Sequence, residues 1–98
     1  MTVILHTLNA SPTSSAFSDC LLVAAAGDAI VLMGDGVYVA IDGTPAYTAI
    51  LANGAEIYLL ATDAGAAGVT RAPQGIALAT MDDFVTLSEH YPRQQAWY

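Results

Sequence analysis

The chain has very few positive charges. It contains no lysine and two arginines, Arg71 and Arg93, against nine acidic residues, and its net charge at pH 7 is −7. A surface that binds nucleic acid needs several cations to displace the counterions of the phosphates. We therefore expect no direct nucleic-acid binding. An excess of acidic residues most often serves to keep a protein in solution. The alternative interpretation is that it steers the chain toward a basic partner.

Cysteine and long apolar runs are also scarce. Cys20 is the single cysteine, which excludes an internal disulfide and a cysteine-rich zinc site and is typical of a reducing cytoplasm. The longest apolar run, residues 21–26, falls far short of the roughly 20 residues that a membrane span needs. The first five residues lack the basic leader and the cleavage site of a signal peptide. The sequence predicts a cytoplasmic protein without a membrane segment.

What the chain has is apolar content, at 55% of 98 residues, enough for one domain over residues 1–98 with a single core. Short apolar, β-branched segments predict strands at residues 2–8, 29–33, 56–60 and 76–79. Capping residues and stop signals predict helices from residues 13–15 to about 26, at 44–52 and at 80–91, with a short helix or turn at 62–67. Residues 37–41 fit either a short helix or an extended segment.

Strands that alternate with helices indicate βαβ units. We therefore predict a three-layer α/β fold of the flavodoxin-like kind, with a mostly parallel sheet of four to five strands and helices on both faces. Binding sites in such sheets form where the carboxyl ends of strands meet the following loops.

Cys20 is the one residue suited to sulfur chemistry. It shares an apolar stripe of the first predicted helix with Phe17, Leu21 and Ala24, and a cysteine on such a stripe behaves as a small hydrophobic residue. Neither a cation nor a helix N-terminus lies beside it to stabilise the thiolate, and Asp19 disfavours it. Core packing is the favoured interpretation, and sulfur transfer by Cys20 is the alternative.

Other candidates for chemistry have structural explanations. His6 lies in the first predicted strand, and His90 lies at a helix C-terminus, where the helix dipole favours it. No spacing of histidines and carboxylates predicts a metal site. The segment 34–36, Gly-Asp-Gly, lacks the spacing of a phosphate-binding loop and presents a carboxylate to the phosphate. We expect no metal and no cofactor.

Trp97 and Tyr98 close the chain after Pro92 has ended the last predicted helix. Such a tail frays unless it docks. It either docks on the edge of its own sheet or inserts into a partner, since tryptophan and tyrosine are enriched among interface anchors. The second interpretation makes Trp97 and Tyr98 interface residues.

Taken in order, several short motifs resemble the TusB/DsrH family over nearly the whole chain. They are Leu-His-Thr-Leu at 5–8, Ser-Pro at 11–12, Gly-Asp-Gly-Val-Tyr at 34–38, Asp-Phe-Val-Thr-Leu at 83–87 and Gln-Ala-Trp at 95–97. The resemblance implies a DsrEFH-like fold and a small subunit of a sulfurtransferase complex. Its partners would be TusC/DsrF-like and TusD/DsrE-like subunits, in a heterohexamer that is a dimer of heterotrimers.

The resemblance also implies a function. In the TusB branch, the complex relays persulfide sulfur toward 2-thiolation of the wobble uridine of tRNA. In the DsrH branch, it moves sulfur in the cytoplasm during sulfur oxidation. The main catalytic cysteine belongs to the TusD/DsrE-like partner in both, and Cys20 matches a first-helix cysteine that some members have and others lack. We expect an accessory subunit of the tRNA branch. The alternatives are a DsrH-type subunit with Cys20 as sulfur carrier, and a flavodoxin-like domain that binds a small molecule.

Overall fold

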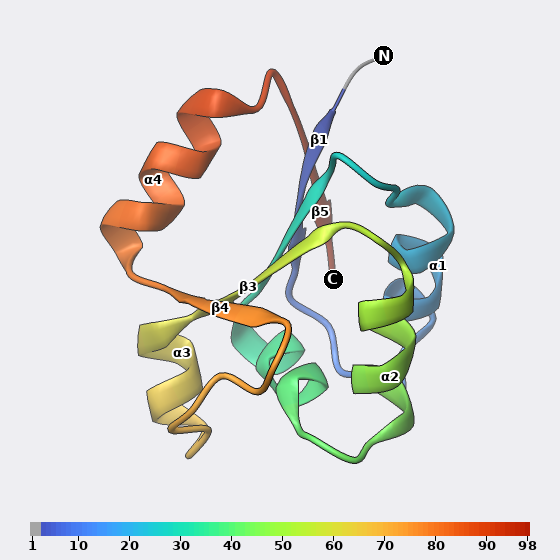
Figure 1. Cartoon of the computed structure of the whole chain (residues 1–98), viewed down its shortest axis with the longest axis vertical. Helices are drawn as coiled ribbons and strands as arrows, with labels where there is room; N and C mark the ends of the chain where they lie inside the picture. The colour runs from blue at the N-terminus through green and yellow to red at the C-terminus, as the bar shows by residue number, and fades with distance from the viewer. Residues whose placement is uncertain (1–2) are drawn as a thin grey trace.

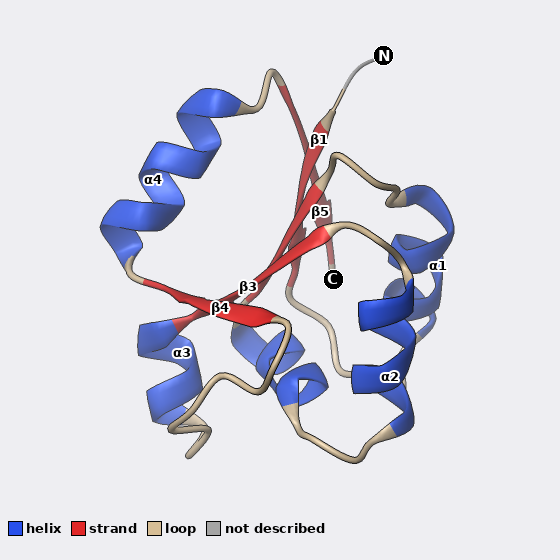
Figure 2. Cartoon of the chain, in the orientation of Figure 1, coloured by secondary structure: helices blue, strands red, loops and turns tan. Residues whose placement is uncertain are grey.

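The computed structural model describes residues 3–98 and contains one five-stranded sheet in which every pair of neighbouring strands is parallel (Figures 1 and 2). The strand order is β4-β3-β2-β1-β5. The strands are β1 (Ile4–Leu8), β2 (Ala29–Leu32), β3 (Glu56–Leu60), β4 (Ile76–Ala79) and β5 (Arg93–Trp97). The helices are α1 (Ser15–Val23), the 3₁₀ helix η1 (Gly34–Ala40), α2 (Pro45–Ala52), α3 (Ala61–Ala66) and α4 (Met81–His90).

The strand order explains why the helices form two unequal layers. From β1 to β4 the chain moves steadily toward one edge of the sheet, and then β5 returns to the far side of β1. Parallel crossovers are right-handed, so a reversal of direction places the crossover helix on the opposite face. Figure 1 shows α1 and α2 on one side of the sheet and α4 on the other. The predicted three-layer α/β fold is confirmed.

Each face of the sheet has its own core. The larger core lies under α1 and α2 and includes Leu8, Ile30 and Ile50, all fully buried. The smaller core lies under α4 and contains Leu5, Ala29, Val31 and Leu60, with Phe84 and Tyr91 packed against it. Strand β2 contributes to both cores because its successive side chains point to opposite faces, and all four of its residues are buried. This is the continuous apolar run that predicted a strand covered on both faces.

Helix starts follow the predicted capping residues. Ser14 caps α1 by accepting a hydrogen bond from the amide of Phe17. Thr44 caps α2 in the same way, directly before Pro45. Thr80 and Asp83 form a reciprocal capping box at the start of α4. These side chains satisfy amides that have no partner within the helix, and they fix where each helix begins.

Two details differ from the sequence-based expectation, and one open alternative is decided. Helix α1 ends at Val23 rather than near residue 26, because Ala24 is extended and the next amide is held by Asp28. The ambiguous residues 37–41 mostly belong to η1. Residues 93–97 form a fifth strand paired with β1, which no pattern in Arg-Gln-Gln-Ala-Trp predicts. Residue 2, the start of the first predicted strand, lies outside the described residues. Over residues 3–98, no helix has the length and apolarity that a membrane crossing requires.

Candidate functional site

Cys20 lies on the inner side of α1 and is fully buried. Phe17 and Ala24 are buried beside it, and Leu21 is half-buried, so the predicted apolar stripe is confirmed. Burial, followed by the negative charge of Asp28, raises the pKa of the Cys20 thiol to about 12. The thiol is therefore protonated at neutral pH.

A protonated, buried thiol is a poor sulfur acceptor, because the thiolate is the nucleophile in persulfide and disulfide exchange. Sulfur transfer by Cys20 stays a prediction, and it requires that the inner side of α1 become accessible. The sequence predicted that the neighbouring Asp19 would disfavour the thiolate. The carboxylate that raises the pKa of Cys20 is instead Asp28, which lies 8 positions further along the chain.

Asp28 lies directly before β2 and is hydrogen-bonded both to β1 and to the loop that follows α1. Its carboxylate accepts hydrogen bonds from the Ile4 amide at 3.0 Å, the Ala25 amide at 3.2 Å and His6 Nε2 at 3.0 Å. Burial by itself would raise the pKa of Asp28. The hydrogen bonds from His6, Ile4 and Ala25 outweigh burial and hold the pKa below its usual value of 3.8. Asp28 is therefore an ionised, buried acceptor.

His6 connects Asp28 to the end of the sheet. Trp97 Nε1 donates a hydrogen bond to His6 Nδ1 at 3.1 Å, and the two rings stack with centroids 6.2 Å apart. An indole nitrogen is only a donor, so Nδ1 of His6 must be the acceptor and Nε2 must carry the proton given to Asp28. His6 is thus a neutral, fully buried histidine with both nitrogens paired, which agrees with the structural interpretation of this residue.

The same contacts locate the aromatic tail. Trp97 is half-buried against its own chain, whereas the side chain of Tyr98 is 84% exposed. Docking on the edge of its own sheet, the first of the two sequence-based interpretations, describes Trp97. Of the two predicted interface residues, Trp97 is therefore packed against its own chain and Tyr98 is exposed. Their role at an interface stays a prediction.

The Gly-Asp-Gly segment forms a packed corner at the carboxyl edge of the sheet. The amide of Gly34 donates to Asp63 Oδ2 at 2.8 Å. A Cβ at Gly36 would lie 2.1 Å from the carbonyl oxygen of Leu8. A carboxylate already occupies the amide that a phosphate would need, which supports the prediction that this segment is not a phosphate-binding loop.

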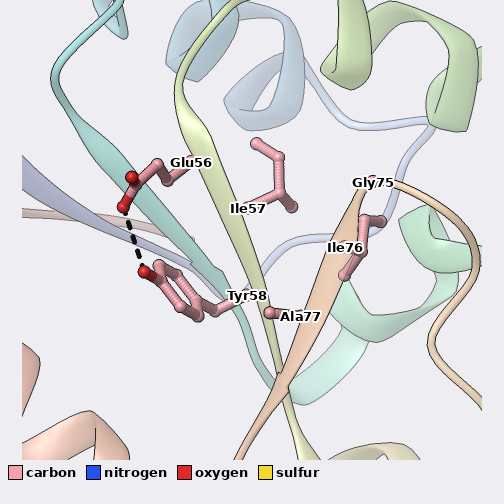
Figure 3. A pocket seen from close by; sticks show the side chains of 6 residues that line it. All are labelled: Glu56, Ile57, Tyr58, Gly75, Ile76 and Ala77. Atoms are coloured by element: carbon pink, nitrogen blue, oxygen red, sulfur yellow. Dashed lines mark hydrogen bonds between the residues drawn. The ribbon is translucent and has the colours of Figure 1, made fainter.

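A hollow of about 400 Å³ lies at the amino ends of β3 and β4 (Figure 3). Glu56 and Tyr58 extend to one face of β3, and Ile57 extends to the other. The Tyr58 hydroxyl donates to Glu56 Oε2 at 3.0 Å; burial, followed by this hydrogen bond, raises the pKa of Tyr58. In parallel sheets, ligands bind at the carboxyl edge, which is the opposite edge. This hollow is a surface depression at the amino ends of two strands, and side chains from both faces of the sheet line it. We assign it no role in catalysis.

Two hollows lie at the carboxyl edge, and Tyr38 lines both. One, of about 290 Å³, is acidic and is lined by Gly34, Asp35, Tyr38, Asp63, Ala66 and Ala67. The other, of about 330 Å³, is almost entirely apolar and is lined by Pro12, Thr13, Tyr38, Ile41, Thr44, Pro45 and Ala46. Within residues 3–98, no cluster of His, Cys, Asp or Glu could hold a metal ion.

Comparisons with known proteins agree with the resemblance in the motifs. Residues 10–94 match the family described as DsrH like protein. The chain is 36% identical to protein TusB of Pectobacterium parmentieri, 35% to that of Sodalis glossinidius and 35% to that of Escherichia coli K12. Each match covers 96% of this chain and all of the relative. The chain belongs to the TusB/DsrH family. Members of this family are sulfur-relay subunits.

A solved structure supports the fold. The ychN protein of Escherichia coli superposes with a TM-score of 0.74 over 99% of this chain and all of that one, at 14% identity. At this level of identity the likeness concerns the fold alone.

Sequence reasoning missed Asp28, and it expected binding sites at the carboxyl edge without singling out Tyr38. A charged residue directly before an apolar strand was a usable signal for Asp28, since a buried carboxylate needs partners. Two of its partners, Ile4 and His6, lie on β1, more than twenty positions earlier in the sequence, and only the fold brings them to Asp28.

Proposed function

We propose that the chain is a non-catalytic, accessory subunit of a heterohexameric sulfurtransferase complex in the cytoplasm. It joins TusC/DsrF-like and TusD/DsrE-like subunits in a dimer of heterotrimers. The complex relays persulfide sulfur toward 2-thiolation of the wobble uridine of tRNA, and the main catalytic cysteine is on the TusD/DsrE-like partner. The observation that carries the proposal is the similarity to TusB proteins over 96% of the chain.

The state of Cys20 supports an accessory role. Its thiol is buried and its pKa is about 12, so the thiolate is scarce at neutral pH. A relay step needs a thiolate that attacks the outer sulfur of a persulfide: a new S–S bond forms, the old one breaks, and the donor cysteine leaves as a thiolate. A partner's cysteine is better suited to that step than Cys20.

The distribution of charge supports a division of labour. Residues 1–70 contain neither lysine nor arginine, and the whole chain has two arginines. Contact with tRNA phosphates needs a basic surface. We therefore assign RNA contact to later proteins of the relay.

Replacement of TusB in Escherichia coli tests the proposal. A strain without its own TusB would receive this chain or its Cys20→Ala variant, and 2-thiouridine would be measured in digested tRNA by mass spectrometry. We expect both to restore thiolation to the same extent. No restoration by either chain, although both accumulate, would count against the tRNA function. Restoration by the unaltered chain alone, with a folded variant, would make Cys20 a carrier.

The match of residues 10–94 to the DsrH like family and the presence of a cysteine at position 20 favour a second candidate. In this candidate the chain is a DsrH-type subunit of cytoplasmic sulfur oxidation, and Cys20 carries the persulfide. Incubating the assembled complex with a persulfide donor and mapping the added sulfur by mass separates the two. Added sulfur on Cys20 supports this candidate, and sulfur confined to a partner's cysteine excludes it.

A further inference from the structure

The two hollows at the carboxyl edge share one lining side chain. Tyr38 of η1 lines both the apolar hollow and the acidic hollow. The Tyr38 side chain is 41% exposed, and so is that of Ile41, which lines the apolar hollow. We call this surface, residues 12–13, 34–46 and 63–67, the Tyr38 surface. Large exposed apolar side chains rimming a pocket are typical of a protein-interaction site.

Every charged side chain within the segments of the Tyr38 surface is acidic. Asp35 and Asp63 line the acidic hollow, and Asp42 is exposed beside Ile41. The first cation in the sequence is Arg71, four positions after Ala67, and it does not line either hollow. An occupant would therefore place its positive charges opposite these carboxylates and its apolar atoms opposite Pro12, Ile41 and Pro45.

We propose that the Tyr38 surface binds a segment of a different protein subunit in which an apolar side chain is adjacent to an arginine or lysine. The apolar side chain fills the hollow between Pro12 and Pro45, and the cation enters the acidic hollow. There it meets Asp35 and the face of the Tyr38 ring, an arrangement that favours a cation. The identity of that subunit, a member of the same sulfur-relay complex, rests on the proposed function.

A second copy of this chain is a poorer occupant of the Tyr38 surface. The chain has a net charge of −7, and a symmetric pair would bring two sets of Asp35 and Asp42 together. Like charges that face each other across an interface oppose association. A basic partner turns the same carboxylates into attractive contacts and accelerates the encounter.

The outer face of α4 lies on the other face of the sheet. Asp82, Asp83 and Glu89 are exposed on this ten-residue helix, as expected for a helix in contact with water. It also carries Val85, whose side chain is 50% exposed. Val85 therefore offers a control position, because it is apolar and about as exposed as Ile41 but lies on a different face of the sheet.

The test measures assembly of the chain with its TusC/DsrF-like and TusD/DsrE-like subunits by isothermal titration and analytical centrifugation. Ile41→Asp and Val85→Asp introduce the same charge at two exposed positions, and circular dichroism verifies that each variant is folded. We expect binding of Ile41→Asp to be weaker by a factor of about ten or more, and binding of Val85→Asp to be close to that of the unaltered chain. We also expect Asp35→Asn to weaken binding and to reduce its salt dependence.

The outcomes separate this inference from the proposed function. If the unaltered chain assembles with neither subunit, the proposed function fails. If it assembles and Ile41→Asp binds as well as Val85→Asp, the complex stands and the Tyr38 surface is not its interface. A dimer of the chain alone that Ile41→Asp dissociates would show that a second copy is the occupant and would overturn the inference. Hydrogen exchange gives an independent measurement: residues 38–46 should become protected in the complex, and unchanged exchange there contradicts the proposal.

Discussion

Trp97 Nε1 donates a hydrogen bond to Nδ1 of His6 across 91 positions of the sequence, at 3.1 Å. This bond connects the last strand, β5, to the first strand, β1, and His6 Nε2 in turn is hydrogen-bonded to Asp28 Oδ2 at 3.0 Å. Three segments, β1, β5 and the loop that joins α1 to β2, therefore share one set of hydrogen bonds. The first two predictions concern this set.

Replacing Trp97 by phenylalanine keeps an aromatic ring but removes the donor to His6. His6 is fully buried, so its Nδ1 loses a partner, and we expect the free energy of unfolding to fall by about 1–2 kcal/mol. Urea denaturation followed by circular dichroism measures the change. Tyr98→Ala is the control: its side chain is 84% exposed, and it should alter stability by less than about 0.5 kcal/mol. Equal effects of the two variants would show that Trp97 has no special role.

The pKa of Asp28 predicts how stability depends on pH. The pKa of Asp28 is lowered in the folded chain from its usual 3.8. At pH values between the lowered pKa and 3.8, the unfolded chain therefore binds more protons than the folded chain. The stabilising contribution of Asp28 is therefore complete above pH 3.8 and declines as the pH falls toward the lowered pKa. Asp28→Asn should be less stable at neutral pH, and its deficit should shrink with acidification. Urea titrations at several pH values measure this deficit, and exposed Asp42→Asn is the control. A deficit that stays constant with pH would contradict the assignment.

Burial of Cys20 predicts slow alkylation. Its pKa is about 12 instead of 9.0, which lowers the thiolate fraction near pH 8 by roughly a thousandfold, and burial blocks the reagent as well. Iodoacetamide labelling, followed by mass spectrometry, should be slow for the native chain and fast in concentrated urea. Fast labelling of the native chain would show that α1 opens readily, and would favour the hypothesis that Cys20 carries sulfur.

Gly36 predicts a steric limit at the corner between β1 and η1. Gly36→Ala places a Cβ 2.1 Å from the carbonyl oxygen of Leu8, so the backbone must shift, at a cost of about 2–3 kcal/mol or more. Gly65→Ala in α3 is a matched control, since a Cβ there meets nothing within 4 Å and alanine favours the helix by about 0.5–1 kcal/mol. Thermal melts should separate the two variants clearly. Similar melting temperatures would mean that the corner is not tightly packed.

Local sequence was sufficient for most of the fold. The apolar run at 29–33, the Thr-Pro pair at 44–45 and the capping box of Thr80 and Asp83 each determine their structure with neighbours in sequence. Strand β5 was not predictable in the same way, because Arg93, Gln94 and Gln95 are exposed edge residues without alternation. Their conformation comes from pairing with β1.

The same limit applies to the candidate sites. The stripe that buries Cys20 repeats along one helix, and its spacing therefore revealed it. The network of Asp28 and the Tyr38 surface depend on residues that are far apart in sequence, so no spacing pattern could predict them. Trp97 was recognised as unusual, but the choice between its own sheet and a partner needed the position of His6.

Pairing of β5 with β1 also has a consequence for synthesis on the ribosome. One edge of β1 has no neighbour until residues 93–97 have emerged, although β2 covers its other edge much earlier in the chain. An unpaired strand edge is a template for association with other chains. A nascent chain of this protein therefore passes through a long interval in which its oldest strand is open to mispairing, and any truncation before Arg93 would make that interval permanent.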